Sequence, residues 1–195
     1  FRLSLRVSVC GKGEIMEENS VVLSLVVPCY NEAEAIPLFY EEACRVVNEM
    51  ALSESVEFVF VDDGSKDETL LVLKDLCQRV HFVSFSRNFG KEAALYAGLE
   101  KACGMYTAVL DADLQDPPSL LPQMLSELTD EGYDCAATKR TTRKNEPPVR
   151  SFFARLFYKI MARMSNVPVV DGARDFRLMT RGYKKAVLSL AEKNR

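Results

Sequence analysis

Short runs of β-branched and other apolar residues alternate with longer segments of helical period, and this alternation limits the possible folds more than any other feature. Strands are expected over residues 21–27, 56–61, 81–85, 105–110 and 133–139. Helices are expected over residues 34–50, 68–79, 91–102 and from Pro117–Pro118 to 131. Parallel strands need long crossovers and cover on both sides. The pattern therefore predicts an α/β fold, with a mostly parallel sheet and helices on both faces.

Length and composition are those of one folded domain. The chain has 195 residues, of which 48% are hydrophobic, which excludes disorder as the main state. The longest near-continuous apolar run, Val21–Val27, is far shorter than the about 20 residues that span a bilayer. We expect residues 1–19 to form an irregular leader and residues 20–195 to form one domain.

Charge and cysteine content exclude other classes of function. The net charge of −3 argues against a protein that wraps nucleic acid. The six cysteines form no CxxC pair, and His81 is the one histidine, so a zinc site is not expected. Because several cysteines fall in apolar segments, they are interpreted as free thiols in a reducing cytosol.

Residues 149–164 form a strongly amphipathic helix in the predicted arrangement. Apolar residues recur at alternating spacings of three and four, beside a basic stripe of Arg155, Lys159 and Arg163. Such a helix packs on its own core, makes a subunit contact in a homo-oligomer, or lies on a membrane surface with its cations near anionic headgroups. The sequence leaves these three possibilities open.

Polar side chains gather where three of the expected strands end. The first strand runs into Pro28–Glu32, the second into Asp62–Ser65, and the fourth into Asp111–Asp116. Ligands bind at the carboxyl ends of strands in such sheets. Period-two geometry places Asp111 and Asp113 on one side, with Gln115 next in line. Two carboxylates and an amide predict a Mg²⁺ or Mn²⁺ site completed by phosphate oxygens.

Two further loops have ordinary structural interpretations. Ser65 followed by Glu68 fits a capping box, so Ser65, Asp67 and Glu68 are assigned mainly to helix initiation. Gly90 is interpreted as the start of the next helix, although Asn88, Gly90 and Lys91 could also contact a ligand.

The order and spacing of five sequence motifs resemble those of the inverting family 2 glycosyltransferases of the GT-A fold. They are VVPCYNEAEAI, VFVDDGSKDET, SFSRNFGKEAALYAG, LDADLQDPP and VDGARDFRLMTR. The chain is most similar to the polyprenol-phosphate glycosyltransferases, the group of bactoprenol glucosyltransferase and dolichol-phosphate mannose synthase. The resemblance runs from about Leu23 to the C-terminus and makes residues 20–195 a GT-A catalytic domain. Members of this group often continue into membrane helices, which we expect to be missing from this chain.

The resemblance also implies roles for individual residues. The residues implied for the nucleotide sugar are Pro28, Tyr30, Glu32, Asp63, Asp111 and Arg177. Asp111, Asp113 and Gln115 would hold the metal, and Arg140 and Arg150 the acceptor phosphate. The catalytic set would be Asp113, Arg140 and Asp175.

The expected reaction transfers a sugar from a nucleotide sugar, UDP-glucose or similar, to a polyprenyl phosphate at the cytoplasmic membrane face. Because a phosphate monoester is already largely ionised at neutral pH, no general base is required. The chain by itself is expected to be soluble or peripheral. Two alternatives remain: a soluble family 2 enzyme acting on a glycan or protein hydroxyl, with Asp175 as base, and a nucleotide-binding fragment without activity.

Overall fold

The computed structural model describes residues 21–76, 80–139 and 173–190. The chain divides into two compact units, residues 1–136 with 176–195 and residues 137–175. The helices and strands are β1 (Leu23–Cys29), α1 (Ala35–Glu49), β2 (Val56–Asp62), α2 (Thr69–Asp75), β3 (His81–Ser84), α3 (Lys91–Lys101), β4 (Tyr106–Val109), the 3-10 helix η1 (Pro118–Leu120), α4 (Leu121–Thr129), β5 (Cys135–Lys139), β6 (Ala173–Thr180) and α6 (Arg181–Ser189).

The strands form one mixed sheet in the order β3-β2-β1-β4-β6-β5. β1 lies in the parallel part and pairs with β2 on one side and β4 on the other. β3 extends this part by pairing in parallel with β2. β6 runs antiparallel to β4, with Arg177 opposite Val109. The predicted, mostly parallel sheet is therefore confirmed.

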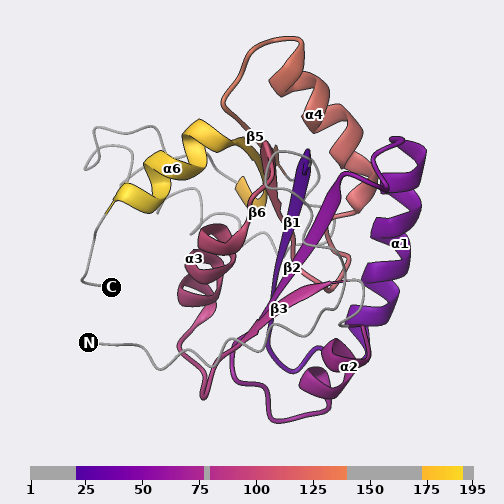
Figure 1. The fold of residues 1–195 in the computed structure, drawn as a ribbon, viewed down its shortest axis with the longest axis vertical. Coiled ribbons are helices and arrows are strands. Elements are labelled where there is room, and N and C mark those ends of the chain that lie inside the picture. Colours follow the sequence, from indigo (N-terminus) through magenta and orange to yellow (C-terminus); the bar gives the residue numbers. More distant parts are fainter. Residues whose placement is uncertain (1–20, 77–79, 140–172, 191–195) are drawn as a thin grey trace, which may run out of the picture. The chain divides into compact units, whose positions relative to one another are not determined.

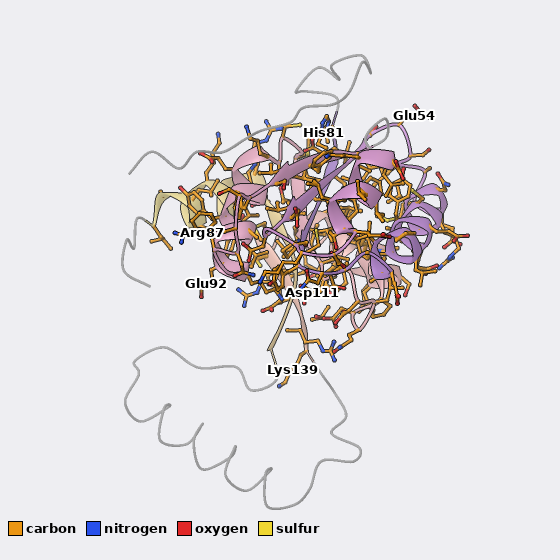
Figure 2. All side chains as sticks on the ribbon, turned by 90° about the horizontal axis from the view of Figure 1, so that it is seen from below. Glu54, His81, Arg87, Glu92, Asp111 and Lys139 are labelled. Atoms are coloured by element: carbon orange, nitrogen blue, oxygen red, sulfur yellow. The ribbon has the colours of Figure 1, made fainter. Side chains whose placement is uncertain are left out.

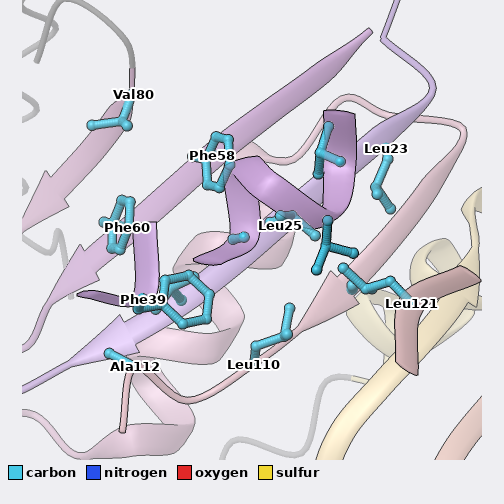
Figure 3. Close-up of a cluster of buried hydrophobic side chains, with 14 of the residues drawn as sticks. Leu23, Leu25, Phe39, Phe58, Phe60, Val80, Leu110, Ala112 and Leu121 are labelled. Atoms are coloured by element: carbon cyan, nitrogen blue, oxygen red, sulfur yellow. The ribbon is translucent and has the colours of Figure 1, made fainter. Parts of the chain in front are cut away.

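Helices cover both faces of the sheet (Figure 1). Alternate strand residues point to opposite faces, and those of β1 separate into two cores accordingly. Leu23, Leu25 and Val27 pack in the larger core, which contains buried residues of α1, α2 and α4 (Figure 3). Val26 points to the other face and packs with Leu99 of α3. This two-sided burial explains why β1 is apolar at successive positions.

Helix and strand boundaries differ from the expected ones in a few places. The helix expected over residues 68–79 is shorter, since α2 runs from Thr69 to Asp75 and Leu76 is its C-cap. The strand expected from residue 133 begins at Cys135, after two exposed residues. The leader, residues 1–19, and the amphipathic helix, residues 149–164, lie outside the described residues. None of the described helices is long and apolar enough to cross a membrane.

A close approach fixes α3 against β1. Gly98 of α3 is buried, and a Cβ atom placed on it would lie 2.4 Å from Cγ1 of Val26 and 3.1 Å from Cγ2 of Val61. A side chain at this position would force the helix away from the sheet, so glycine allows the packing seen here.

A buried polar cluster ties the amino ends of the strands to the end of α3. The carboxylate of Glu57 accepts hydrogen bonds from the hydroxyl of Ser24 and, at 2.6 Å, from the backbone N–H of Cys103. Ser24 Oγ in turn accepts from the N–H of Gly104 at 2.8 Å. The buried charge of Glu57 is thus stabilised by two hydrogen bonds.

Two cations of α6 complete this cluster by binding the carbonyl groups that follow α3. Arg181 Nη2 donates to the carbonyl of Cys103 at 2.6 Å, and Lys184 Nζ donates to that of Ala102. Burial, followed by the charge of Arg181, lowers the pKa of Lys184. Cations at the C-terminus of a helix interact favourably with the negative end of its dipole, so these two side chains of α6 stabilise the end of α3.

Gly98→Ala is expected to lower the free energy of unfolding by about 1–3 kcal/mol, the usual effect of overpacking a core. Urea denaturation followed by circular dichroism measures it. The matched control is Gly182→Ala in α6, where the added Cβ would lie 3.8 Å from its nearest neighbour and alanine is the better helix former. Equal stability of the two variants would contradict the close packing of α3 on β1.

Candidate functional site

Parallel pairing brings the loops after β1, β2 and β4 to the carboxyl edge of the sheet. Cys29 lies opposite Asp62, and Val26 opposite Val109, so these strands end side by side. Figure 2 shows Asp111, just after β4, on the other side of the molecule from Glu54 and His81, which precede β2 and begin β3. The edge predicted to bind ligands is therefore formed by these loops.

Hydrogen bonds link the loop after β1 to the loop after β2. The N–H of Asn31 donates to Ser65 Oγ at 2.9 Å, and the N–H of Lys66 donates to Asn31 Oδ1 at 2.8 Å. The N–H of Glu32 donates to Thr69 Oγ1 at 2.8 Å. Asn31 adopts a φ of 57°, in the left-handed region that asparagine tolerates better than most residues. The two loops thus form one connected surface.

The expected capping box at Ser65 and Glu68 is wrong. α2 begins at Thr69, and Glu68 at its N-cap makes no side-chain capping bond. Asp67 instead accepts from the N–H of Thr69 at 3.0 Å and from that of Ala33 at 3.3 Å. Ser65 faces Asn31 instead, because its hydroxyl oxygen accepts a hydrogen bond from the backbone N–H of Asn31 in the neighbouring loop.

Asp63 fixes the segment that leads into α3. Its side chain is buried, and its two carboxylate oxygens accept from the N–H of Phe89 at 2.7 Å and of Gly90 at 2.9 Å. Gly90 is the N-cap of α3 with a φ of 97°, which confirms that the helix starts there. Because both bonds are to a charged acceptor, they are stronger than ordinary ones and determine where α3 begins.

The first residue of α3 pairs with the first acidic residue after β4. Lys91 Nζ lies 2.7 Å from Oδ1 and 2.8 Å from Oδ2 of Asp111. Both side chains are partly exposed, so the pair lies at the surface of the site. The sequence named Lys91 as a possible ligand contact but did not indicate this partner, because the two residues are 20 positions apart.

The turn after β4 presents Asp113 at the surface. Leu114 adopts a φ of 56°, which is rare for a branched side chain, and Asp113 Oδ1 accepts from the N–H of Gln115 at 3.0 Å. Residues held in sparsely populated conformations are concentrated at binding and catalytic sites. Asp113 and Gln115 are both exposed on this turn.

Negative charge accumulates along this edge. The pKa of Glu32 is raised by burial and then by the charges of Asp113, Asp111 and Asp67. The thiol pKa of Cys29, at the end of β1, is also raised, by burial first and then by the nearby carboxylates. Glu32 therefore reports that the carboxylates after β4 lie close to the loop after β1. This is the convergence that the sequence predicts.

The residues after β4 fit a Mg²⁺ or Mn²⁺ ion in the chemistry of their donors. Asp111, Asp113 and Gln115 offer carboxylate and amide oxygens, which are the donors that these ions prefer. Among the described residues, no group of three or more His, Cys, Asp and Glu is arranged to hold a metal by itself. A cation here would therefore take its remaining ligands from water or from a bound phosphate.

The other predicted site residues occupy different environments. Pro28 is buried within β1, whereas Tyr30 is 39% exposed just beyond it. Arg177 is exposed on β6, opposite Val109. Asp175 is exposed and belongs to the other compact unit, residues 137–175. Arg140 and Arg150 lie outside the described residues.

A family model and several curated relatives all match this chain to the same family of glycosyltransferases. The model of glycosyl transferase family 2 matches residues 24–188. The prophage bactoprenol glucosyl transferase homolog of Escherichia coli K12 is 40% identical over 175 residues, 88% of this chain and 56% of the relative. The bactoprenol glucosyl transferase of Shigella phage SfV has the same values. A glycosyltransferase of Synechocystis, sll0501, is 38% identical over 90% of this chain and 55% of its own length. The chain spans about half the length of these curated relatives.

Solved structures share the fold. The mannosyltransferase PcManGT of Pyrobaculum calidifontis, in complex with GDP-Man and Mn²⁺, has a TM-score of 0.58 at 21% identity, over 85% of this chain and 46% of its own. Glucosyl-3-phosphoglycerate synthase of Mycobacterium tuberculosis, with Mn²⁺, UDP-Glc and phosphoglyceric acid, has a TM-score of 0.58 at 22% identity, over 85% and 58%. These neighbours confirm the predicted GT-A fold.

Glu32→Gln is expected to raise the free energy of unfolding at pH 7 by up to about 1 kcal/mol. The effect is this small because solvent screens the charge of a partly exposed side chain. A raised pKa means that ionising Glu32 disfavours the folded state. This penalty is absent below the ordinary pKa of 4.5 and develops as the pH rises through the raised value. The free energy of unfolding, measured from pH 4 to pH 7, should therefore separate from that of the wild type as the pH rises.

The control is Glu54→Gln, an exposed glutamate in the loop before β2. It should not reproduce the increasing difference. A Glu32→Gln variant that is less stable than the wild type at pH 7 would contradict the charge crowding.

Proposed function

The chain belongs to glycosyl transferase family 2, and on this premise we propose that it transfers a sugar from UDP-glucose or a similar nucleotide sugar to a polyprenyl phosphate. The names of two relatives, both bactoprenol glucosyl transferases or homologs, support a polyprenyl acceptor. The observation that carries the proposal is the parallel pairing of β1 with β2 and β4, which brings the loops that contain Glu32, Asp111 and Asp113 to one edge of the sheet. A dense set of carboxylates fits a site that binds a diphosphate through a divalent cation.

Asp111, Asp113 and Gln115 hold Mg²⁺ or Mn²⁺ in this proposal, and the solved neighbours that contain Mn²⁺ support this ion class. The ion, when bound, supplies Lewis-acid stabilisation of the departing nucleoside diphosphate. Asp113, exposed on its turn, is the principal carboxylate on the diphosphate side. Asp111, two residues earlier, is the second carboxylate that binds the cation in this proposal.

The nucleotide is bound by the loops after β1 and β2. Tyr30, exposed beside the sheet edge, offers an aromatic ring for the base. Pro28 is buried and shapes the end of β1. Asp63 is also buried. It accepts hydrogen bonds from the base in this proposal, and it also acts through the loop before α3, whose N–H groups it binds. Glu32 lines the diphosphate side, and Arg177 supplies positive charge from β6.

The acceptor reacts by direct displacement at the anomeric carbon, with inversion. Its phosphate needs no general base, since it is already ionised at neutral pH. Arg140 and Arg150 hold this phosphate in the proposal, because guanidinium groups bind phosphate in bidentate fashion. Asp175 is kept in the proposal as a catalytic residue, on the ground of the family resemblance alone. The amphipathic pattern of residues 149–164 supports contact with the cytoplasmic membrane surface in this proposal.

Asp113→Asn is expected to weaken Mn²⁺-dependent binding of UDP-glucose by at least about tenfold, equal to about 1.4 kcal/mol. An amide keeps the size of the side chain but removes the charge that holds the cation. Isothermal titration calorimetry with and without Mn²⁺ measures the change. Asp130→Asn, at the C-cap of α4, is the matched control and should bind as the wild type does. Equal binding by both variants would show that Asp113 does not hold the cation.

The reaction itself is tested by incubation with Mn²⁺, undecaprenyl phosphate and a panel of radiolabelled UDP- and GDP-sugars. Label is expected in the chloroform–methanol extract with at least one donor, and the α-linked donor should give a β-linked product by NMR. Label found only on soluble glycan or protein acceptors would instead favour a hydroxyl acceptor with Asp175 as base. Donor binding without transfer to any acceptor would reduce the function of this chain to nucleotide binding.

A further inference from the structure

The pairing of Lys91 with Asp111 places a cation on a carboxylate that the proposed metal also needs. Lys91 Nζ contacts both oxygens of Asp111, at 2.7 and 2.8 Å. A divalent ion bound by Asp111 would take at least one of these oxygens. It would also place its charge beside the ammonium group. The two cations therefore compete for the same carboxylate.

The position of Lys91 is not explained by the needs of its own helix. It is the first residue of α3, where the helix dipole disfavours positive charge and where Glu92, the next residue, is the expected type. A lysine that is unfavourable for its helix but paired with a candidate metal ligand indicates a role in the site.

The surrounding structure holds this lysine in place. Asp63 binds the N–H groups of Phe89 and Gly90, immediately before Lys91. Gly98 allows α3 to pack directly on Val26 of β1. The backbone of Lys91 is thus fixed from both sides, and only its side chain needs to move for the pair with Asp111 to open.

We propose that Lys91 is an exchangeable counter-ion of Asp111, which hinders binding of the divalent cation alone and lets the cation and the nucleoside diphosphate bind cooperatively. The inference rests on the proposed function. The diphosphate brings negative charge that accepts the ammonium released from Asp111. Each ligand then favours the other, and this coupling is reciprocal. Lys91 acts through Asp111 and is a positioning residue.

Lys91→Met tests the proposal, because methionine keeps an unbranched side chain of similar length and removes the charge. Mn²⁺ affinity is measured by electron paramagnetic resonance of free Mn²⁺, first without nucleotide and then with saturating UDP or GDP. Without nucleotide, the variant should bind Mn²⁺ about two- to fivefold more tightly, the range expected for a partly exposed ion pair. The gain in Mn²⁺ affinity caused by the nucleotide should fall by at least the same factor.

Lys101→Met, the same change at the last residue of α3, is the matched control and should leave both quantities unchanged. Lys91→Arg keeps the charge and should keep the coupling. Circular dichroism checks that each variant is folded.

A Lys91→Met protein whose affinity for Mn²⁺ alone does not exceed that of the wild type, including one with no measurable binding, overturns the inference. A wild-type protein that binds no Mn²⁺ even with UDP or GDP contradicts the proposed function itself. The two failures are therefore distinguishable.

Discussion

Parallel pairing of β1 with both β2 and β4 is the constraint on which the rest of the structure depends. In a parallel sheet all carboxyl ends lie at one edge, so the residues that follow three buried strands must meet there. A slip of one residue in β1 would move the side chains that pack in the core of α1 to the face of α3. The apolar strands thereby determine where the polar loops lie.

The sheet carries polar clusters at both ends, and they differ in how their charges are stabilised. At the amino end, Glu57 is buried and accepts hydrogen bonds from Ser24 and Cys103, while Lys184 binds a backbone carbonyl. At the carboxyl end, the carboxylates of Asp111 and Asp113 raise the pKa of Glu32. The charge of Glu57 is satisfied within the fold, whereas Asp111 is paired with Lys91 at the surface and Asp113 is exposed. This difference is consistent with a structural role for the first cluster and with the binding role proposed for the second.

The sequence predicts β1 to β5, α1 to α4 and the convergence of the strand ends, because each depends on local periodicity or on the topology that follows from it. It fails at Ser65, where a capping box is the best local interpretation but the loop after β1 supplies a competing donor from Asn31. It also misses the partner of Lys91, since the distance between α3 and the end of β4 depends on packing at Gly98 and on the bonds of Asp63. Contacts between loops cannot be predicted from the helical or the strand periodicity of apolar residues.

In the proposed function Asp63 acts in two ways, on the nucleotide and on the start of α3. Its motif implies contact with a nucleotide, yet its oxygens also accept the N–H groups of Phe89 and Gly90. These bonds set the start of α3 and therefore the reach of Lys91 to Asp111. If the proposed function holds, a substitution at Asp63 would alter nucleotide binding directly and alter the proposed cation site through the helix. Loss of donor binding in such a variant would not separate the two effects, whereas Mn²⁺ affinity without nucleotide reports on the second alone.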